Sequence, residues 1–472
     1  MNILLGIDIG TTKICAIAFD ADSGKVVTVC SAANDTSISS EPDASEQDAS
    51  KIINITLKLL AEVADSIGDS SKIAGIGVTG QMHGVLLVSP DGSPLTPLIN
   101  WQDQRGNHIY KPTGRTYTDE VRTRISEDLV ARTGTNPATG FGGVTLFRLA
   151  KTSGIPKDAT ALTIHDYLVR HLTGASVTDP TDAASWGIYD VKGETGWLPE
   201  IESRLDIPVG LLPKVLPTGS IAGTLQAQIA SRTGLHAGIP VAVAIGDNQA
   251  SFIGSVPSIE ESLLFNIGTG GQMSVASDIF TYDVHLDTRP LIKGKWLKVG
   301  ASLCGGSAFK ILADFFSQVG SDLFGQNVSP ESLYNKMTNL AESIAEDDNI
   351  PNFAPYFYGT RTDPTLTAQL LGINTENFTP ACISRAIIRG MANELVSYYE
   401  SAGVAQPGYI VGSGNGFRRN PVLRNEFESK FNKQIQLPPN EEEAAVGAAL
   451  TAGVATGIIA DWNTAGEALY SI

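Results

Sequence analysis

Two segments far apart in this chain of 472 residues share one pattern, a strand, a turn of small residues and a second strand. The first is residues 4–19 and the second is residues 263–276. The turns consist of Gly10, Thr11, Thr12 and Lys13 in the first copy and of Gly268, Thr269, Gly270 and Gly271 in the second. Glycine allows close backbone approach, and turn amides and threonine hydroxyls can bind anionic oxygens. Two related halves that each present such a turn predict a nucleotide held between two lobes.

A single carboxylate, Asp8, lies near the end of the first strand of this pattern. Carboxylate oxygens are preferred ligands of Mg²⁺, so Asp8 can hold a cation beside the phosphates. A Gly-Thr-Thr turn by itself is more often an ordinary hairpin. The functional interpretation therefore depends on the second copy of the turn.

The composition restricts the class of protein. A chain of this length predicts two or three domains, and 42% hydrophobic with 18% charged residues is ordinary for a globular protein. The net charge of -17 argues against a nucleic-acid or acidic-membrane surface, although backbone amides and a metal ion can still bind phosphate locally. No apolar stretch is long enough to span a bilayer, and the first apolar run lacks a basic leader. Four scattered cysteines predict a reduced, cytoplasmic protein.

The spacing of apolar residues predicts the main elements. Residues 49–67 have the periodicity of a helix, and residues 73–78 read as a buried strand. A new strand begins at residue 239, so we expect the lobe boundary near residue 237, with lobes 1–237 and 238–472. The Ala- and Gly-rich segment 441–457 predicts a helix that packs closely against a neighbouring element.

Asp247 follows a strongly apolar strand, in the sequence Gly-Asp-Asn-Gln-Ala. An aspartate at such a place is commonly a helix N-cap or part of an Asx turn. The functional alternative is a general base that faces the cleft between the lobes. Phosphoryl transfer requires positioning, a metal on the phosphates and a carboxylate near the attacking hydroxyl. Asp8 and Asp247, on opposite lobes, could meet these needs in separate roles.

Two polar segments are candidates for a sugar site. Trp101, Asp103 and Arg105 lie in one short turn, where an aromatic face could pack on sugar C–H groups and charged groups could bind hydroxyls. The alternative is a surface salt bridge beside a half-buried tryptophan. The sequence Gln81-Met82-His83-Gly84 interrupts a buried strand with polar groups, which suggests a binding edge.

A third strand-to-glycine turn contains Gly412, Ser413, Gly414 and Asn415. In a two-lobed nucleotide protein it suits adenine and ribose. The sequence His165-Asp166-Tyr167 fits a buried structural cluster and a functional site equally well. The remaining histidines are unclustered, which indicates surface or core positions rather than metal ligands.

In this order, the motifs resemble the FGGY family of carbohydrate kinases within the actin-like ATPase superfamily, over nearly the whole chain. The segments that are most similar to the branch acting on sedoheptulose are 80–84, 100–105, 138–142, 163–167, 183–187 and 245–247. The resemblance implies an α/β fold of two ribonuclease-H-like lobes, with ATP and a sugar in the cleft between them.

The resemblance also implies roles for residues. Asp247 would be the catalytic base, Asp8 would belong to the Mg²⁺–phosphate site, and Thr11, Thr12 and Lys13 would form the phosphate turn. Residues 268–271 would form the second phosphate turn, and residues 412–415 would line the adenosine. Gln81, Met82, His83, Trp101, Asp103 and Arg105 would lie in or near the sugar pocket.

Two departures from the family pattern bear on the substrate. Many members have Lys-Asp-Tyr at the position of His165-Asp166-Tyr167, and many have a Lys and a Trp in the segment matching residues 145–148. Both departures also resemble the sedoheptulose branch. We therefore expect a kinase of sedoheptulose, with xylulose or ribulose as alternative substrates. A non-enzymatic actin-like ATP-binding sensor or filament subunit is the alternative from a different class.

Overall fold

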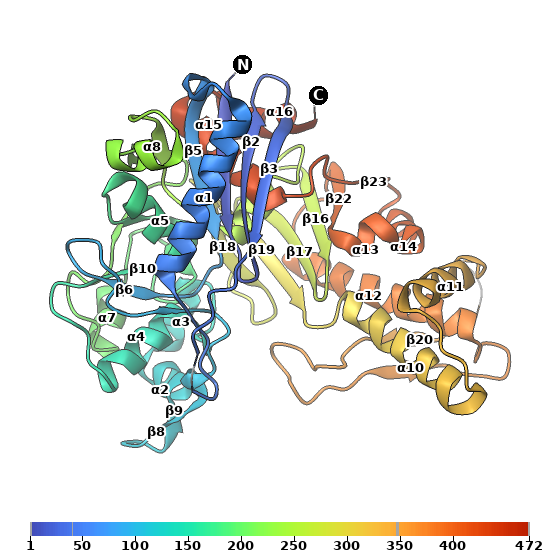
Figure 1. Ribbon diagram of the computed structural model, residues 1–472. Helices are drawn as coiled ribbons and strands as arrows, with labels where there is room; N and C mark the ends of the chain where they lie inside the picture. The colour runs from blue at the N-terminus through green and yellow to red at the C-terminus, as the bar shows by residue number, and fades with distance from the viewer. Residues whose placement is uncertain (1, 40, 346–348, 471–472) are drawn as a thin grey trace.

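The computed structural model describes residues 2–39, 41–345 and 349–470. Two lobes stand side by side, each built on a mixed β-sheet (Figure 1). The first sheet has the order β13-β14-β5-β1-β2-β3, with β15 also paired with β5. Its strands are β1 (Ile3–Ile9), β2 (Lys13–Asp20), β3 (Lys25–Ala33), β5 (Ile73–Gly80), β13 (Ile221–Thr224), β14 (Pro240–Ala242) and β15 (Ile245–Gly246).

The second sheet repeats the core of this arrangement, with the order β18-β19-β17-β16-β22-β23. In each sheet a run of antiparallel strands, β3-β2-β1 in the first and β18-β19-β17-β16 in the second, is followed by a parallel strand, β5 or β22. The strands are β16 (Ser262–Ile267), β17 (Gly271–Ser277), β18 (Asp287–Ile292), β19 (Lys295–Ser302), β22 (Tyr409–Ser413) and β23 (Ile435–Gln436). The repeated hairpin therefore belongs to a fold that occurs twice in the chain. The expected pair of ribonuclease-H-like lobes is confirmed.

Helices cover the sheets of both lobes. The first lobe carries α1 (Ala49–Ile67), α5 (Ile164–Thr173), α6 (Pro180–Ala184), α8 (Ala227–Thr233) and α9 (Asp247–Ile253). A smaller group, α2 (Tyr117–Arg124), α3 (Glu127–Thr133), α4 (Gly142–Lys151) and α7 (Pro199–Arg204), surrounds a separate core at the lower end of this lobe (Figure 1). The second lobe carries α10 (Gly306–Phe324), α11 (Pro330–Glu342), α12 (Pro380–Ala402), α13 (Gly414–Arg419) and α14 (Pro421–Phe431), and the chain ends with α15 (Glu443–Thr456) and α16 (Trp462–Tyr470).

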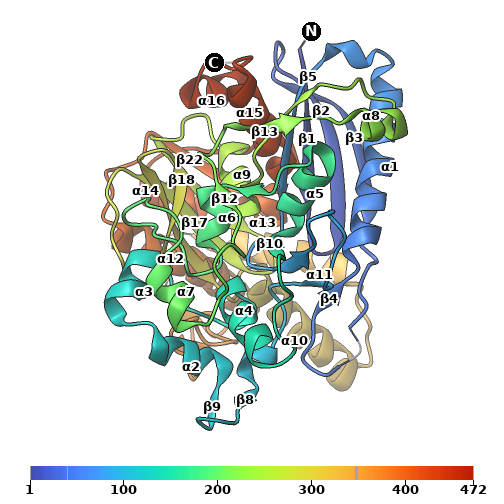
Figure 2. The same cartoon turned by 90° about the vertical axis from the view of Figure 1, so that its left-hand side faces the viewer.

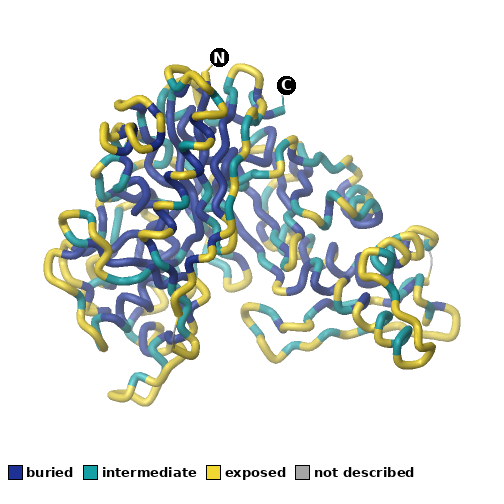
Figure 3. The backbone as a smooth tube through the Cα atoms, viewed as in Figure 1, coloured by how far each residue is buried: buried dark blue, intermediate teal, exposed yellow. Residues whose placement is uncertain are grey.

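The helix predicted at residues 49–67 is confirmed as α1. The Asp48 side chain caps it by accepting a hydrogen bond from the Lys51 amide at 3.0 Å, and Gly68 ends it with a φ of 75°. The apolar stripe that includes Ile52, Leu60 and Val63 is buried against the first sheet. The central strands of both sheets are buried, whereas the edge strand β3, most of α11 and the C-terminal part of α10 are more exposed (Figure 3).

The predicted helix near the end of the chain is also confirmed, and it packs backbone against backbone. A Cβ atom on Gly6 of β1 would lie 1.9 Å from the Ala445 carbonyl oxygen, and one on Gly77 of β5 would lie 1.8 Å from the Ala448 carbonyl oxygen. Only glycine permits this approach. Helix α15 therefore lies against the first sheet although it comes from the end of the chain (Figure 2).

The strands after residue 237 change the expected division of the chain. Strand β14 pairs with β5 and β13, and β15 pairs with β5, so both belong to the first sheet. A boundary at residue 237 would separate these strands from their partners. We propose instead that the first lobe continues through α9 and that the second begins shortly before β16.

Two further findings concern the whole chain. Within its described residues, no helix combines the length and apolarity that a membrane crossing requires. Cys15, Cys30, Cys304 and Cys382 are all free thiols.

Candidate active site

The two phosphate-type turns connect equivalent hairpins. In the first lobe, Ile9 pairs with Ile14, which leaves residues 10–13 at the turn. In the second lobe, Ile267 pairs with Gly271, which leaves residues 268–270. The start of α10 supports this second turn, because the Gly306 amide donates to the Gly268 carbonyl oxygen at 2.9 Å. Each turn thus presents backbone amides beside the end of a buried central strand.

Asp8 is the carboxylate closest to the first turn, and its environment suits a cation. Burial is the largest cause that raises its pKa to about 7, and the charges of Asp247 and Glu442 add to the shift while Lys13 opposes it. Its buried Oδ1 has no hydrogen-bond partner among the described residues. Asp8 and Asp247 are therefore close enough to interact, but the expectation that they lie on opposite lobes is wrong, because β1 and β15 both belong to the first sheet.

The donor set fits Mg²⁺ bound chiefly by water and phosphate oxygens. Across the described part of the chain, no three His, Cys, Asp or Glu side chains converge tightly enough to enclose a metal. Mg²⁺ commonly takes one or two carboxylates and completes its octahedron with waters and substrate phosphates. The unpartnered oxygen of Asp8 meets that requirement.

Lys13, at the end of the first turn, forms an ion pair with Glu442, which immediately precedes α15. Its Nζ lies 2.8 Å from Oε1 and 2.7 Å from Oε2. The carboxylate raises the pKa of Lys13, which keeps the ammonium charged beside the turn. Sequence reasoning missed Glu442, although its place in the run Glu441–Glu443 could have marked it.

Asp247 is the first residue of α9, directly after β15. Gly246 occupies the N-cap position, and no side chain caps this helix. The capping role that the sequence also allowed is therefore not what the structure shows. Burial raises the pKa of Asp247, while His165 and Arg289 oppose that rise. A half-buried carboxylate at a strand end is suited to accept a proton.

Met82 and His83 follow β5 and lie beside this strand end. A Cβ atom on Gly246 would lie 2.7 Å from Cε of Met82, so Met82 packs next to the residue that precedes Asp247. His83 has a φ of 73°, a conformation that costs a residue other than glycine about 1–3 kcal/mol. Its ring stacks on Phe141 with centroids 4.2 Å apart. Burial is the main cause that lowers its pKa to about 3, so the imidazole is neutral at physiological pH.

A hydrogen-bond network links the first phosphate turn to the expected sugar side. The Trp101 Nε1–H donates to Thr11 Oγ1 at 2.9 Å, and Thr11 Oγ1 donates to Gln81 Oε1 at 3.2 Å. Gln81 in turn donates to Gln47 at 2.8 Å, and Gln47 donates to the Thr11 carbonyl oxygen at 3.2 Å. Gln47 lies on β4 (Glu46–Gln47), and no local pattern singled it out. The structure thus brings Thr11 of the expected phosphate turn together with Gln81 and Trp101 of the expected sugar pocket.

Asp103 and Arg105 are buried and bind protein groups. Arg105 Nε donates to Asp103 Oδ2 at 2.8 Å, and its NH2 donates to Glu46 Oε1 at 2.6 Å. Asp103 Oδ2 also accepts from the Ser45 amide at 3.0 Å. These contacts hold the turn containing Trp101 against the segment containing Gln47. A direct contact of Asp103 or Arg105 with sugar stays a prediction.

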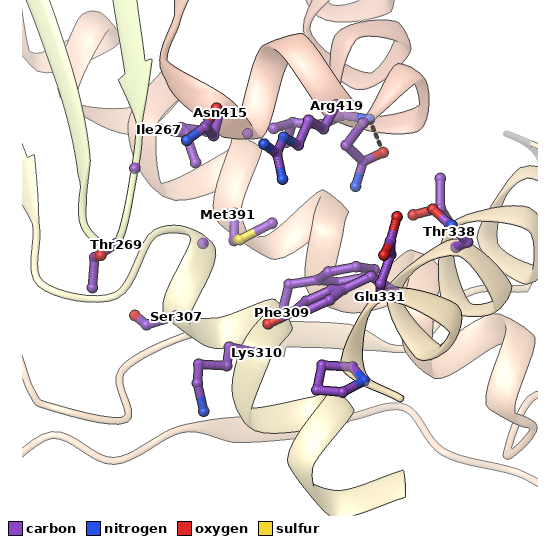
Figure 4. Close-up of a pocket in the computed structure, with 18 residues that line it drawn as sticks. Ile267, Thr269, Ser307, Phe309, Lys310, Glu331, Thr338, Met391, Asn415 and Arg419 are labelled. Atoms are coloured by element: carbon purple, nitrogen blue, oxygen red, sulfur yellow. Dashed lines mark hydrogen bonds between the residues drawn. The ribbon is translucent and has the colours of Figure 1, made fainter. Parts of the chain in front are cut away.

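A pocket of about 1090 Å³ opens in the second lobe (Figure 4). Gly268 and Thr269 of the second turn line one end of it, and Asn415 and Gly416 of α13 lie on its wall. Most of the remaining lining comes from α10, α11, α12 and α14, including Ser307, Phe309, Lys310, Glu331, Tyr334, Thr338, Met391 and Leu423. The Phe309 and Tyr334 rings are stacked with centroids 5.9 Å apart. A pocket that combines apolar and polar side chains beside a phosphate-type turn can accept a nucleoside.

Of the four residues predicted to line the adenosine, only Asn415 lines the pocket. Gly412 and Ser413 lie in β22, and Gly414 forms the turn into α13 with a φ of 85°. Ser413 donates to Glu443 Oε1 at 2.9 Å, which connects this turn to α15. Gly270 and Gly271 likewise shape the hairpin without lining the pocket. The contribution of α10 and α11 was missed, and only the run Gly305-Gly306-Ser307 hinted at it.

Three charged side chains of the second lobe, Asp287, Arg289 and Arg361, lie near His83 and were not predicted. Arg289 of β18 donates to Asp287 at 2.7 Å and to Asn248 at 3.5 Å, and Arg361 lies 3.4 Å from Asp287. Arg289 and His83 both line one small cavity. The second lobe therefore contributes charged groups opposite His83.

Sequence comparison covers both lobes. The profile of the N-terminal domain of the FGGY family of carbohydrate kinases matches residues 3–254, and that of the C-terminal domain matches residues 263–456. The chain belongs to the FGGY family of carbohydrate kinases. As a member of this family it is a sugar kinase. The alternative hypothesis of a non-enzymatic sensor or filament subunit is therefore rejected.

Relatives of this FGGY kinase include sedoheptulokinase from Homo sapiens, 29% identical over 95% of this chain and 96% of that protein. Xylulose kinase from Staphylococcus xylosus is 25% identical over 99% of this chain and 94% of that protein. Among solved structures, xylulose kinase from Rhodospirillum rubrum superimposes with a TM-score of 0.85 at 26% identity, covering 98% of this chain and 92% of that one. Glycerol kinase from Plasmodium falciparum with ADP has the same fold, with a TM-score of 0.81 at 21% identity over 99% of this chain and 92% of that one.

Proposed function

We propose that this FGGY kinase transfers the γ-phosphoryl group of ATP to the terminal primary hydroxyl of a ketose, converting sedoheptulose to sedoheptulose 7-phosphate. The observation that carries the proposal is the position of Asp247. This half-buried carboxylate directly follows β15 of the first lobe, lies beside Met82 and interacts with Asp8.

In the proposed reaction, adenosine occupies the pocket of the second lobe and the turns near Gly10 and Gly268 bind the phosphates. The sugar lies between Met82, His83 and Trp101. Asp247 orients the terminal hydroxyl and accepts its proton as the oxygen attacks the γ-phosphorus in line. Mg²⁺, held at Asp8, would neutralise charge on the phosphate oxygens. Lys13 can turn from Glu442 towards the phosphates.

The choice of sedoheptulose is supported by the 29% identical human relative and by the polar groups opposite His83. A seven-carbon ketose has two more hydroxyls than a five-carbon one, and these need hydrogen-bond partners. Arg289 and Asp287 are suitable partners, because one donates and the other accepts. Arg289 and Asp287 already bond to each other, so a shorter sugar would not leave them unpaired, but it would forgo hydrogen bonds to charged groups that are worth about 1.5–3 kcal/mol each.

Xylulose is the second candidate substrate, supported by the relative from Staphylococcus xylosus and the likeness to the Rhodospirillum rubrum enzyme. Ribulose belongs to the same size class. In both cases Asp247 and the phosphate turns keep the same roles, and only the sugar pocket differs.

The test is a coupled assay of ADP formation with sedoheptulose, xylulose, ribulose and gluconate, with the Asp247→Asn variant beside the native chain. We expect the highest kcat/KM with sedoheptulose, at least about tenfold above xylulose. Asp247→Asn should lose about a hundredfold to ten-thousandfold in kcat and still bind ATP. An equal kcat/KM with xylulose would overturn the assignment of sedoheptulose as the substrate. Normal turnover by Asp247→Asn would overturn the assignment of Asp247 as the base.

A further inference from the structure

The short helix α6 contacts two segments that carry groups of the proposed reaction, β15 before Asp247 and the turn at His83. At its first end, Thr181 Oγ1 accepts a hydrogen bond from the Gly246 amide at 2.8 Å. The Thr181 hydroxyl donates its own proton to Asp179 Oδ1 at 2.6 Å, and both side chains are fully buried. The backbone immediately before Asp247 is therefore tied to α6 by one hydroxyl.

At the other end of α6, Ser185 makes two contacts with His83. The His83 amide donates to Ser185 Oγ at 3.1 Å, and the His83 ring nitrogen Nδ1 lies 2.7 Å from the Ser185 carbonyl oxygen. Ser185 Oγ also donates to the Asp182 carbonyl oxygen at 2.6 Å, which fixes its orientation. These contacts hold His83 in its left-handed backbone conformation and fix the direction of its ring.

Helix α6 is itself held by a buried polar cluster. Asp179 caps it by accepting from the Asp182 amide at 3.0 Å, and Asp179 Oδ2 accepts from Thr218 at 2.7 Å. Asp182 Oδ2 lies 2.6 Å from Nε2 of His165, and both side chains are fully buried. Burial raises the pKa of Asp182 well above its usual range and lowers that of His165, so both favour their uncharged forms. A fully buried cluster of this kind leaves α6 little freedom to move.

We propose that Thr181 and Ser185 are positioning residues, which hold Asp247 and His83 in one fixed geometry through α6. The inference rests on the proposed function for the role of Asp247. Neither hydroxyl contacts substrate in this proposal. Each acts by fixing a neighbour, and transfer to a sugar hydroxyl is sensitive to displacements of about 1 Å in the reacting groups.

The experiment compares Thr181→Val and Ser185→Ala with Thr56→Val as a matched control. Thr56 is also fully buried and its hydroxyl donates to the Ile52 carbonyl oxygen at 2.9 Å, but it lies in α1. We expect Thr181→Val to lower kcat about tenfold to a hundredfold with the KM for ATP unchanged. Ser185→Ala should raise the KM for sugar several-fold, and calorimetry with sugar alone should show the same loss. Thr181→Ser, which keeps the hydroxyl, should restore most of the turnover.

Melting temperatures separate positioning from a general loss of stability. If Thr181→Val and Ser185→Ala lose no more activity than Thr56→Val at an equal drop in Tm, the inference is overturned. Ser185→Ala leaves the Asp179–Thr181 contacts intact. If Thr181→Val does not fold, Ser185→Ala alone tests whether α6 positions its neighbours. The two proposals fail in different ways: an active Asp247→Asn enzyme would refute the proposed base, whereas an inactive one beside unaffected α6 variants would refute the positioning role.

Discussion

Replacing Asp8 by asparagine should stabilise the protein at pH 8 when no Mg²⁺ or nucleotide is present. The pKa of Asp8 is about 7 in the folded chain and has the ordinary value of 3.8 when unfolded. The folded state therefore binds the proton more tightly, and the free energy of unfolding falls as pH rises from about 4 to about 7. Above pH 7 the loss is complete. Three pKa units correspond to about 4 kcal/mol as an upper bound, because Asp8 is not wholly shielded from the cleft.

Asparagine cannot ionise, so Asp8→Asn escapes this cost. We expect its stability gain to be largest near pH 8 and to shrink to about 2 kcal/mol or less at pH 5. The assay is thermal and urea unfolding of both proteins in a chelating buffer across this pH range. The control is Asp22→Asn, which makes the same carboxylate-to-amide change at an exposed hairpin outside the cleft. A variant no more stable than the native chain at pH 8 would refute the reasoning.

Three further predictions concern the cleft. Lys13→Met breaks the half-exposed ion pair with Glu442 and should raise the KM for ATP, measured by ATP saturation. In urea titration it should change the free energy of unfolding by less than about 1 kcal/mol. Trp101→Phe removes the 2.9 Å hydrogen bond to Thr11 and should raise the KM for sugar about fivefold; an unchanged KM would assign that bond no role. Arg289→Gln should reduce kcat/KM for sedoheptulose about tenfold more than for xylulose, and an equal loss on both sugars would place Arg289 outside the specificity pocket.

Much of the fold could be predicted because its signals are local. The two hairpins repeat in sequence and in structure, and the helix at residues 49–67 has the periodicity and caps that define its ends. The Ala- and Gly-rich helix at the end of the chain was predicted to pack closely, because only small side chains allow such contact. The later boundary that we propose in place of residue 237 was not visible in the sequence, because β14 and β15 pair with β5 more than a hundred residues away.

The candidate site was predictable where residues lie at or just after strand ends. Asp8 is the second-last residue of β1, and Thr11, Gln81, Met82 and Asp247 follow strands within two residues. The walls of the second-lobe pocket come largely from the sides of α10 and α11, where Phe309 and Tyr334 look like ordinary amphipathic helix residues. Gln47, Arg289 and Ser185 act through partners remote in sequence, so no spacing rule identifies them.

The close contact of α15 with β1 and β5 has a consequence for how a newly made chain folds. Residues Leu4, Ile17 and Phe19 belong to a core that is completed by Ala445, Val446 and Ala449. At synthesis rates of about 5–20 residues per second, the stretch from 247 to 442 takes on the order of 10–40 s to emerge. The sheet that is made first thus keeps one apolar face open to water until the last helices leave the ribosome. The second sheet has all its strands by residue 436, but Leu264, Leu297 and Val411 lie in this same core, so both halves of the molecule wait for one C-terminal helix.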